Sequence, residues 1–306
     1  MSQNSNVLYH LLAILIVVVW GTTFISTKFL LLSGLSPAGI FVIRFFIAYL
    51  GLIIVSHRRL FCKNLKDEIL MILLGLTGGS MYFLTENMSL NFTTTTNASL
   101  IVCSCPLFST LAICYFFNTK LTKYQILGAT LSFLGMAAVV LNGQFVLHLS
   151  PLGDLLAFGA CLCWAAYSVI IRLLVSNYSS VFITRKVFAY GLISIIPWFF
   201  IYPEDSPVSV SFGDPIVWGN LLFLSLVASL ACFSLWTVCI KKLGVIMATN
   251  YVYINPIATV CAAVIFLSET ITIWFVLGSI LILLGLWLHN KEKQVSKKTN
   301  EQRFQS

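Results

Sequence analysis

Residues 123–142 read KYQILGATLSFLGMAAVVLN, and 150 positions later residues 273–292 read IWFVLGSILILLGLWLHNKE. Gly128 matches Gly278, and Gly135 matches Gly285, at this offset. Without a gap, the same offset also pairs Pro106/Pro256, Leu74/Leu224, Phe83/Phe233, Ala98/Ala248, Ala112/Ala262, Phe116/Phe266 and Leu127/Leu277. A repeat of this length inside an apolar chain is typical of transporters, which rock two related halves about a site near the membrane midplane.

The composition indicates an integral membrane protein. Hydrophobic residues make up 59% of the 306 residues and charged residues 9%, and the mean hydropathy is +0.96. A soluble domain carries about 25% charged residues. Apolar runs of roughly 20 residues, each long enough to cross about 30 Å of hydrocarbon, recur along the whole chain. We therefore expect an all-α protein with ten transmembrane helices, at residues 8–29, 38–56, 68–90, 96–117, 123–142, 152–174, 181–201, 217–239, 246–267 and 271–289.

The repeat divides the chain into two five-helix units. We expect the first repeat over residues 8–142 and the second over 152–289, followed by a basic cytoplasmic tail at 290–306. The first apolar run is expected to span the membrane and not to be a cleaved signal. Residues 1–7 carry no Lys or Arg, and no clear small-x-small cleavage site precedes the end of the run.

The distribution of lysine and arginine predicts the orientation. With the N-terminus in the cytoplasm, the inward loops and the tail hold 14 of the 18 basic residues, whereas the outward loops hold none. We therefore expect a multi-pass protein of the plasma membrane, of the bacterial cytoplasmic or inner-membrane type, with both termini in the cytoplasm. Five helices per half is an odd number, so the second half enters the membrane upside down and the repeat is inverted.

The net charge of +8 follows from this topology, and we expect no nucleic acid partner. The basic tail is expected to meet anionic lipid headgroups. The sequence shows no phosphate-binding glycine loop, no H-E-x-x-H motif and no nucleophile–base pair, so we expect neither an enzyme nor a cofactor. A gradient of solute, proton or another ion would then drive transport.

Two cysteine pairs, Cys103-x-Cys105 and Cys161-x-Cys163, resemble metal or redox motifs at first sight. Residues two apart on a helix point about 200° away from each other, so neither pair clamps one ion easily. We expect these cysteines to be buried small hydrophobic residues and expect no metal site.

Charged residues inside the apolar runs are candidates for function because they are costly in hydrocarbon. Glu86 near the outer end of the third run is a candidate for contact with a substrate ammonium or for proton coupling, or else it lies at the water boundary. Arg44, two turns into the second run, is expected to face the interior and to pair with a carboxylate such as Glu86 or with a substrate carboxylate. Lys28, Arg185 and Lys186 are expected to reach the membrane interface as anchors.

Further candidates are prolines, aromatic residues and amides. Pro106 and Pro256 occupy matching positions in the two halves and are expected to break helices beside the cavity. The aromatic residues would suit a flat or partly apolar solute, although core packing is the alternative for each. The complete set of candidates for substrate binding or coupling is Trp20, Thr23, Arg44, Tyr82, Glu86, Asn97, Trp164, Tyr167, Asn250 and Tyr253. The glycine pairs are expected to be points of close approach between helices.

Short motifs recur in a characteristic order along both halves. They are Trp20-Gly21-Thr22-Thr23-Phe24, Arg44-Phe45 with Ala48, Ser89-Leu90-Asn91-Phe92-Thr93 through Asn97-Ala98-Ser99-Leu100 to Pro106-Leu107, and Ala248-Thr249 through Asn255-Pro256 to Leu267-Ser268-Glu269. In these motifs the chain resembles the EamA family of the drug/metabolite transporter superfamily over about residues 8–289. The resemblance implies a ten-helix transporter of small metabolites or drugs with both ends in the cytoplasm.

The sequence departs from the family pattern at three places. Asn118-Thr119 stands where the first half of many relatives shows Gly-Glu, so the acid survives only in the repeat partner, Glu269. Glu86-Asn87 is not general in the family. Residues 8–29 contain no acid, which puts in doubt the proton or cation exchange that small multidrug exporters perform through a glutamate in the first helix.

Taken together, these features favour a secondary transporter, with export as the favoured direction, of a small organic metabolite or drug such as an amino acid or related amine. Its partners would be the solute, membrane lipid and a coupling proton or ion, and a homodimer is compatible with the sequence. The alternative is a non-transporting or lipid-handling protein, such as a flippase partner or a scaffold, which needs no polar residues facing a cavity. A sugar-nucleotide carrier is less favoured, because only Arg44 and Lys28 are available for phosphates.

Overall fold

The computed structural model describes residues 3–56, 60–93, 100–141, 150–205, 214–267 and 272–303. Within these ranges the protein is all-helical and contains no strand. The elements are α1 (Gln3–Leu32), α2 (Pro37–Val55), α3 (Leu65–Gly75), η1 (Leu76–Ser80), α4 (Met81–Phe92), α6 (Cys105–Phe117), α7 (Lys123–Leu141), α8 (Pro151–Leu174), α9 (Ser180–Ile201), η2 (Pro203–Asp205), α10 (Pro215–Leu222), η4 (Phe223–Ala231), α11 (Cys232–Leu243), α12 (Val245–Asn250), η5 (Tyr251–Ile254), α13 (Asn255–Leu267) and α14 (Ile273–Arg303).

Length and hydropathy make the chain a multi-pass integral membrane protein. In the described ranges, nine helical stretches are long and apolar enough to cross a membrane. The tenth apolar run, Ile273–His289, is helical but belongs to the shorter apolar helices of 10–17 residues. Ten spans therefore remain a prediction, while the all-helical membrane class is confirmed.

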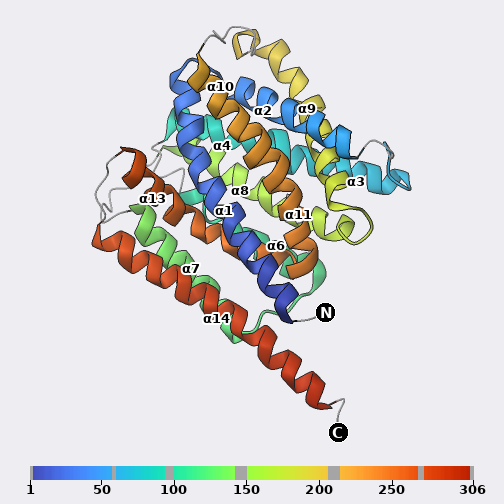
Figure 1. Cartoon of the computed structure of the whole chain (residues 1–306), viewed down its shortest axis with the longest axis vertical. Coiled ribbons are helices and arrows are strands. Elements are labelled where there is room, and N and C mark those ends of the chain that lie inside the picture. The colour runs from blue at the N-terminus through green and yellow to red at the C-terminus, as the bar shows by residue number, and fades with distance from the viewer. Residues whose placement is uncertain are drawn as a thin grey trace.

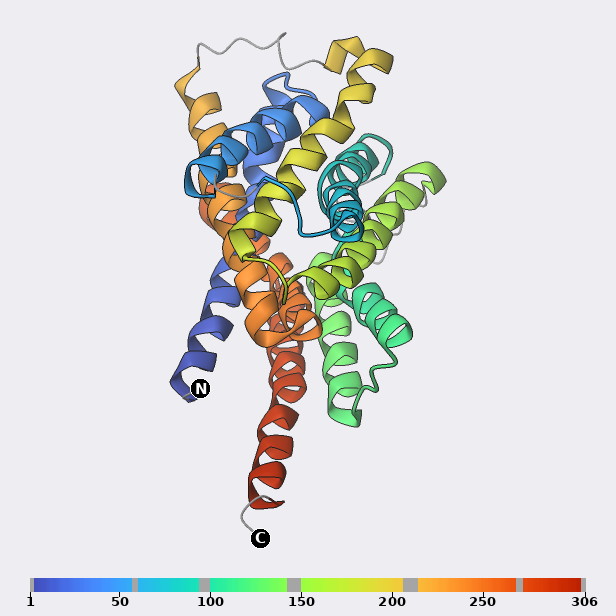
Figure 2. The ribbon, with the colours of Figure 1, turned by 90° about the vertical axis from the view of Figure 1, so that its right-hand side faces the viewer.

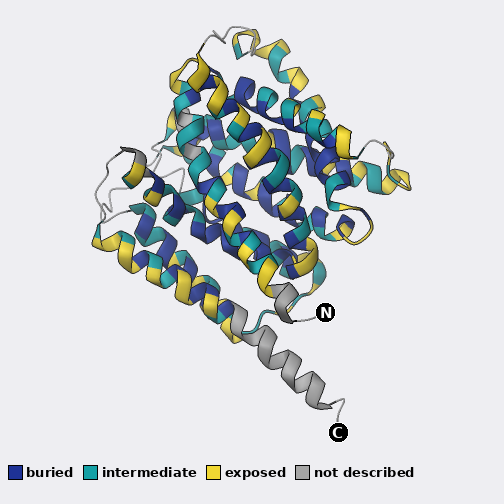
Figure 3. Cartoon of the chain, in the orientation of Figure 1, coloured by how far each residue is buried: buried dark blue, intermediate teal, exposed yellow. Residues whose placement is uncertain are grey.

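The outer surface is apolar, as contact with lipid requires. Figure 3 shows exposed residues along the outward side of α14 and buried residues concentrated inside the bundle. Large hydrophobic side chains are exposed there and on α7, including Leu127, Leu134, Leu283 and Trp287. Continuous apolar exposure of this kind is rare on soluble monomers, and hydrocarbon solvates it without penalty.

The helices form one bundle, and the N-terminus and the C-terminus of the chain lie on the same side of it (Figures 1 and 2). Helices α7 and α14 lie side by side along one edge of the bundle (Figure 1). Helix α8 packs against α4 and α6, and α1 packs against α11 and α13. This arrangement brings the middle of α1 close to the middle of α8.

The four repeat-related glycines place α7 and α14 in close contact, as the sequence predicted. An added Cβ at Gly128 would lie 2.5 Å from the carbonyl oxygen of Gly285, and one at Gly135 would lie 2.5 Å from that of Gly278. Between these contacts, Ser132 Oγ donates to the carbonyl oxygen of Ile282 at 3.3 Å. Small residues allow such backbone contact in hydrocarbon, where packing and not hydrophobicity holds helices together.

Two π-helical segments interrupt the spans Leu65–Ser89 and Pro215–Leu243. The segment η1 separates α3 from α4 and contains Gly79, whose φ of −121° and ψ of −106° are not helical. The segment η4 separates α10 from α11. A π turn inserts an additional residue, so it rotates the residues after it relative to a regular α-helix. Each segment thereby changes which side chains of its span face the centre of the bundle.

A helix break also precedes each of the two repeat-related prolines, Pro106 and Pro256. Helix α6 begins at Cys105-Pro106 after a turn, and α13 begins at Asn255-Pro256 after the 3₁₀ segment η5. Both prolines thus occupy the first turn of a helix, where a missing N–H costs no hydrogen bond. In the structure a new helix starts at each of these positions, and a role of the two prolines beside a cavity stays a prediction.

Candidate substrate-binding site

An aromatic cluster lies where α1, α4 and α8 meet. Trp20 and Trp164 contact edge to face, with ring centroids 6.3 Å apart. Trp164 also stacks on Tyr167 at 5.2 Å and meets Tyr82 at 5.3 Å. The structure therefore brings together four of the residues that were predicted from the sequence, one from α1, one from α4 and two from α8. Such rings form an apolar wall with defined edges and faces.

Two charged side chains of opposite sign occupy this region without a direct ion pair between them. Arg44 is buried in α2, where its Nε donates to Ser229 Oγ of η4 at 2.5 Å and its guanidinium carbon lies 5.2 Å from the ring centroid of Phe83. Glu86 accepts a hydrogen bond from the Tyr82 hydroxyl at 3.1 Å. Among the described residues, the ion pair present is that between Lys186 and Glu68. The Arg44–Glu86 pair, one of the sequence-based alternatives, is thus not formed.

The location of Arg44 depends on the π segment. Helix α2 packs along η4, and Ser229 is fully buried there. The hydrogen bond uses one of the five N–H groups of the guanidinium, and in the described part of the chain the others have no hydrogen-bond acceptor. A buried guanidinium with unused donors is equipped to bind a carboxylate in a forked geometry.

Three more buried donors near the cluster have no hydrogen-bond partner among the described residues. They are the indole Nε1 of Trp164, the indole Nε1 of Trp236 and the hydroxyl of Tyr253. Trp236 is fully buried with its ring 5.1 Å from Trp20. By contrast, Trp20 Nε1 donates to the carbonyl oxygen of Ala228 at 3.0 Å. Since buried polar groups almost always have a partner, unpaired donors beside a charged cluster point to a ligand or to water.

Trp236 was absent from the sequence-based candidates. The sequence offered little indication of a role for Trp236, because it is a single tryptophan within an apolar run and belongs to no motif. Tyr253, which was predicted, follows Asn250 in the interrupted stretch between α12 and α13. Tyr253 thus belongs to the helical break that precedes α13.

Two other candidates make contacts of a different kind. Thr23 donates its hydroxyl to the carbonyl oxygen of Trp20 at 2.6 Å, within its own helix. The Asn250 side chain donates to the buried His289 ring, with 2.9 Å from Nδ2 to Nε2, at the contact of α12 and α14. Neither polar group belongs to the aromatic cluster. Asn97 and the side chain of Lys28 lie outside the described part of the chain.

The break before Pro106 is stabilised by a cysteine. Proline lacks the N–H that would bond to the carbonyl of Val102. The thiol of Cys161 on α8 lies 2.8 Å from the carbonyl oxygen of Ile101 and 3.7 Å from that of Val102. Its sulfur is also 3.1 Å from the sulfur of Cys105. One member of each predicted cysteine pair thus meets the other across two helices, which spacing within each pair did not predict.

Arg185 and Lys186 are buried, so the expectation of interfacial anchors was wrong for both. Lys186 pairs with Glu68 at the start of α3, and Tyr190 donates to the same carboxylate. Arg185 donates to the carbonyl oxygen of Ser56. Glu68 compensates the buried ammonium charge, which would be costly without a partner.

A tyrosine in the loop between α8 and α9 extends this network. Tyr178 donates its hydroxyl to Asp67 at 2.6 Å and accepts from the backbone N–H of Lys63 at 3.0 Å. Burial, together with the hydrogen bond to Asp67, raises the pKa of Tyr178 to about 12. The phenol therefore stays protonated at neutral pH and fixes the start of α3 against this loop.

The fold defines a multi-pass integral membrane protein. A model of the EamA-like transporter family matches residues 7–141 and 151–290. The chain belongs to the EamA-like transporter family. Family membership indicates a transporter and not an enzyme.

Curated relatives cover nearly the whole chain. An uncharacterized transporter of Archaeoglobus fulgidus is 27% identical over 91% of this chain and 96% of its own length. A probable amino-acid metabolite efflux pump of Escherichia coli is 25% identical over 94% of this chain and 95% of its own. A probable terminal-alkyne amino-acid exporter of Streptantibioticus cattleyicolor is 23% identical over 91% and 92%.

A solved crystal structure shares the fold. It superposes with a TM-score of 0.72, covers 94% of this chain and 97% of its own, and is 18% identical in sequence. At this identity the likeness shows the fold alone. It agrees with the all-helical architecture of the described ranges.

Proposed function

We propose that this protein is a secondary transporter that exports small zwitterionic metabolites of the amino-acid class by alternating access. The observation that carries the proposal is the presence of two opposite charges, Arg44 and Glu86, that form no direct ion pair beside an aromatic wall. A zwitterion offers a carboxylate to the guanidinium and an ammonium to the carboxylate. Names of relatives that refer to amino-acid efflux and export support this solute class.

The proposed architecture is ten helices in two inverted five-helix repeats. It is supported by the antiparallel contacts of Gly128 with Gly285 and of Gly135 with Gly278, because the 150-residue offset converts each of these two contacts into the other. Ser132 bonds to Ile282, its own repeat partner. Contacts of this kind lie on an in-plane pseudo-twofold axis, about which the halves of an inverted-repeat transporter rock. The absence of basic residues from the outward loops supports cytoplasmic termini in a plasma membrane.

The direct test is transport by purified protein in proteoliposomes. Vesicles would be loaded with labelled amino acids, amino-acid amides or N-acetylated amino acids. Comparing their efflux would show whether transport requires the ammonium of the solute, its carboxylate or both. We expect efflux of zwitterions only, and we expect Arg44→Gln and Glu86→Gln each to lower it roughly tenfold or more, since a charged hydrogen bond contributes about 1.5–3 kcal/mol. Arg44→Lys should retain part of the activity, because it keeps the charge without the fork.

Matched control variants remove one charge of the same sign from an exposed side chain outside the proposed site. Lys66 and Glu204 are exposed, so Lys66→Gln and Glu204→Gln should transport like the wild type. Wild-type efflux by folded Arg44→Gln and Glu86→Gln variants would refute the central charge pair. It would favour the lipid-handling or scaffold alternative, which a lipid-scrambling assay on the same vesicles would then reveal.

Glu86 also suits a coupling role, since in the described residues its carboxylate accepts a hydrogen bond only from a neutral tyrosine, Tyr82. If Glu86 exchanges a proton for the solute, an imposed pH gradient should accelerate efflux in the wild type but not in Glu86→Gln. An equal response of both proteins to the gradient would exclude this role and leave Glu86 as an ammonium contact.

A further inference from the structure

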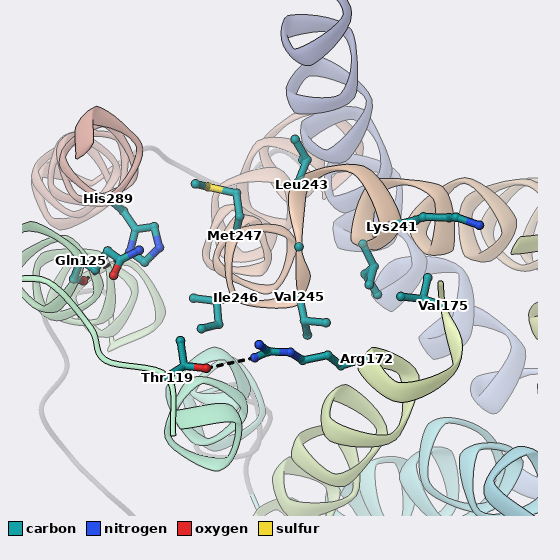
Figure 4. A pocket seen from close by; sticks show the side chains of 12 residues that line it. Thr119, Gln125, Arg172, Val175, Lys241, Leu243, Val245, Ile246, Met247 and His289 are labelled. Carbon is teal, nitrogen blue, oxygen red and sulfur yellow. Dashed lines mark hydrogen bonds between the residues drawn. The ribbon is translucent and has the colours of Figure 1, made fainter. Parts of the chain in front are cut away.

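A hollow of about 350 Å³ lies at the ends of α6, α8 and α11 and the start of α12 (Figure 4). Arg172 and Thr119 lie on one side of it, and Val245, Ile246 and Met247 lie opposite (Figure 4). This hollow is separate from the aromatic cluster. Arg172 follows Trp164 by eight residues on α8, a distance of about 12 Å along a helix axis.

Arg172 is the cation that points into the hollow. Its guanidinium carbon lies 4.2 Å from the ring centroid of Phe117, and its Nη1 donates to Thr119 Oγ1 at 3.3 Å. The other cation at the rim, Lys241, donates to the carbonyl oxygen of Tyr178 at 3.3 Å, and Figure 4 shows its ammonium pointing away. Among the described residues, no Asp or Glu lines the hollow, and no carboxylate lies within 4.0 Å of Arg172.

The local sequence explains why this charge is uncompensated. Asn118 ends α6 in the left-handed conformation, with a φ of 48°, and Thr119 follows it. Glu269 is the residue 150 positions after Thr119, so the acid of the second copy is replaced by a neutral hydroxyl in the first. A threonine accepts one hydrogen bond from the guanidinium but does not neutralise it. Most of the forked donor set of Arg172 therefore remains for an anion.

The rest of the lining defines the body of the ligand. Val245, Ile246 and Met247 present apolar side chains opposite the guanidinium (Figure 4). The far side is closed by His289, which is 3% exposed and hydrogen-bonded to Asn250. An amphipathic molecule of amino-acid size fits this combination, because small ligand sites combine apolar walls with a few oriented polar groups.

We propose that this hollow is a second binding site, in which Arg172 binds the carboxylate of a small amphipathic molecule and Val245, Ile246 and Met247 contact its apolar body. The inference rests on the proposed function, since the proposed orientation places the loop at 119–122 and the end of α11 at 241–244 on the cytoplasmic side. A solute leaving the cell would meet this site first. Only the carboxylate is required here, whereas the central site also requires the ammonium.

Binding of N-acetyl-L-leucine, which has a carboxylate and no ammonium, tests the proposal. The full-length protein in nanodiscs of neutral phosphatidylcholine would be titrated by calorimetry. We expect saturable binding of N-acetyl-L-leucine to the wild type. Arg172→Gln should weaken this binding roughly tenfold or more, and Arg172→Lys should weaken it less. L-leucinamide, which lacks the carboxylate, should not compete. Lys120→Gln removes an exposed charge one residue beyond Thr119 and should bind like the wild type.

A second variant tests the hollow without changing Arg172. Ile246→Trp should fill the hollow and abolish binding while leaving the guanidinium in place. Binding that survives both Arg172→Gln and Ile246→Trp would overturn the site. Binding of phosphatidylglycerol through Arg172, with none of N-acetyl-L-leucine, would assign the same chemistry to a lipid and would also overturn it. Arg172-dependent binding in a protein that transports no amino acid would instead refute the proposed function alone.

Discussion

Addition of one methyl group at the crossing of α7 and α14 should destabilise the whole bundle. A Cβ at Gly285 would lie 2.4 Å from Ser132 Oγ, 2.5 Å from the carbonyl oxygen of Gly128 and 2.6 Å from the backbone nitrogen of Ser132. Ordinary contact begins at 3.4 Å. Two of these three atoms belong to the backbone and cannot rotate away, so Gly285→Ala must separate the helices by about 1 Å.

The expected cost arises from overpacking in a tight interior, which is typically about 1–3 kcal/mol. Separation also weakens the hydrogen bond from Ser132 to the carbonyl of Ile282, now 3.3 Å long. We expect the midpoint of thermal unfolding in detergent to fall by at least about 2 °C. The measurement is the fraction of monodisperse protein that survives heating, determined by size-exclusion chromatography.

Gly219→Ala is the matched control, because an added Cβ on this exposed residue of α10 meets nothing within 4 Å. Alanine is up to about 1 kcal/mol better than glycine inside a helix, so this variant should be as stable as the wild type or slightly more so. Combining Gly285→Ala with Gly128→Ala should cost less than the sum of the single changes, since one separation relieves both clashes. Equal stability of Gly285→Ala and the wild type would refute the close crossing.

Three further predictions concern interior contacts. Glu68→Gln leaves the ammonium of Lys186 buried without its carboxylate and should lower stability by about 3–5 kcal/mol, measured by chemical denaturation in mixed micelles. Replacing Trp236 with benzothienylalanine, which keeps the ring shape but lacks the N–H, should leave the thermal midpoint of the solute-free protein unchanged and weaken solute binding measured by calorimetry. Copper phenanthroline should join Cys105 to Cys161, because their sulfurs are 3.1 Å apart, and maleimide labelling after denaturation should then lose two thiols.

Each of these three predictions has a control experiment. Adding Lys186→Met to Glu68→Gln should restore most of the lost stability, since a buried ion pair is replaced by neutral groups; no recovery would contradict the pairing. Cys161→Ser should protect Cys105 from the copper reagent, whereas loss of labelling at Cys105 in that variant would contradict their contact. Unchanged solute affinity in the Trp236 analogue would remove its N–H from the binding site.

The sequence predicted the helical regions well because the bilayer itself imposes their length and satisfies no backbone hydrogen bonds. Each expected apolar run contains helix in the described ranges, including the short Ile273–His289. The burial of Arg44 was predictable for the same reason, since a charge in the middle of a span avoids lipid. The crossing glycines were predictable from the repeat, which constrains both partners at once.

The contacts inside the bundle were harder to predict. Helices surrounded by lipid are apolar on all sides, so periodicity does not mark the face that meets a neighbour. A π turn adds one residue, which rotates the rest of the span by about 100° relative to the regular helix. The segment η4 places Ser229 beside Arg44 in this way, and no local pattern signals it. The burial of Lys186 likewise depends on Glu68, 118 residues away.

The two proposed sites share α8, and this has a consequence for the order of events in transport. On our proposal Arg172 binds the carboxylate at the cytoplasmic end, and Arg44 binds it afterwards at the central site, whose Trp164 lies about 12 Å along α8 from Arg172. A solute bound too tightly at the first site would not dissociate toward the second. Arg172 must therefore bind the carboxylate more weakly than the buried Arg44 does. Its partial exposure and its contact with Phe117 provide that difference, since solvent screens a charge at the rim more than a charge in the core. Transport through Arg172→Gln should therefore show a raised KM with kcat preserved, whereas Arg44→Gln should lose kcat as well. The reverse pattern would contradict this order of binding.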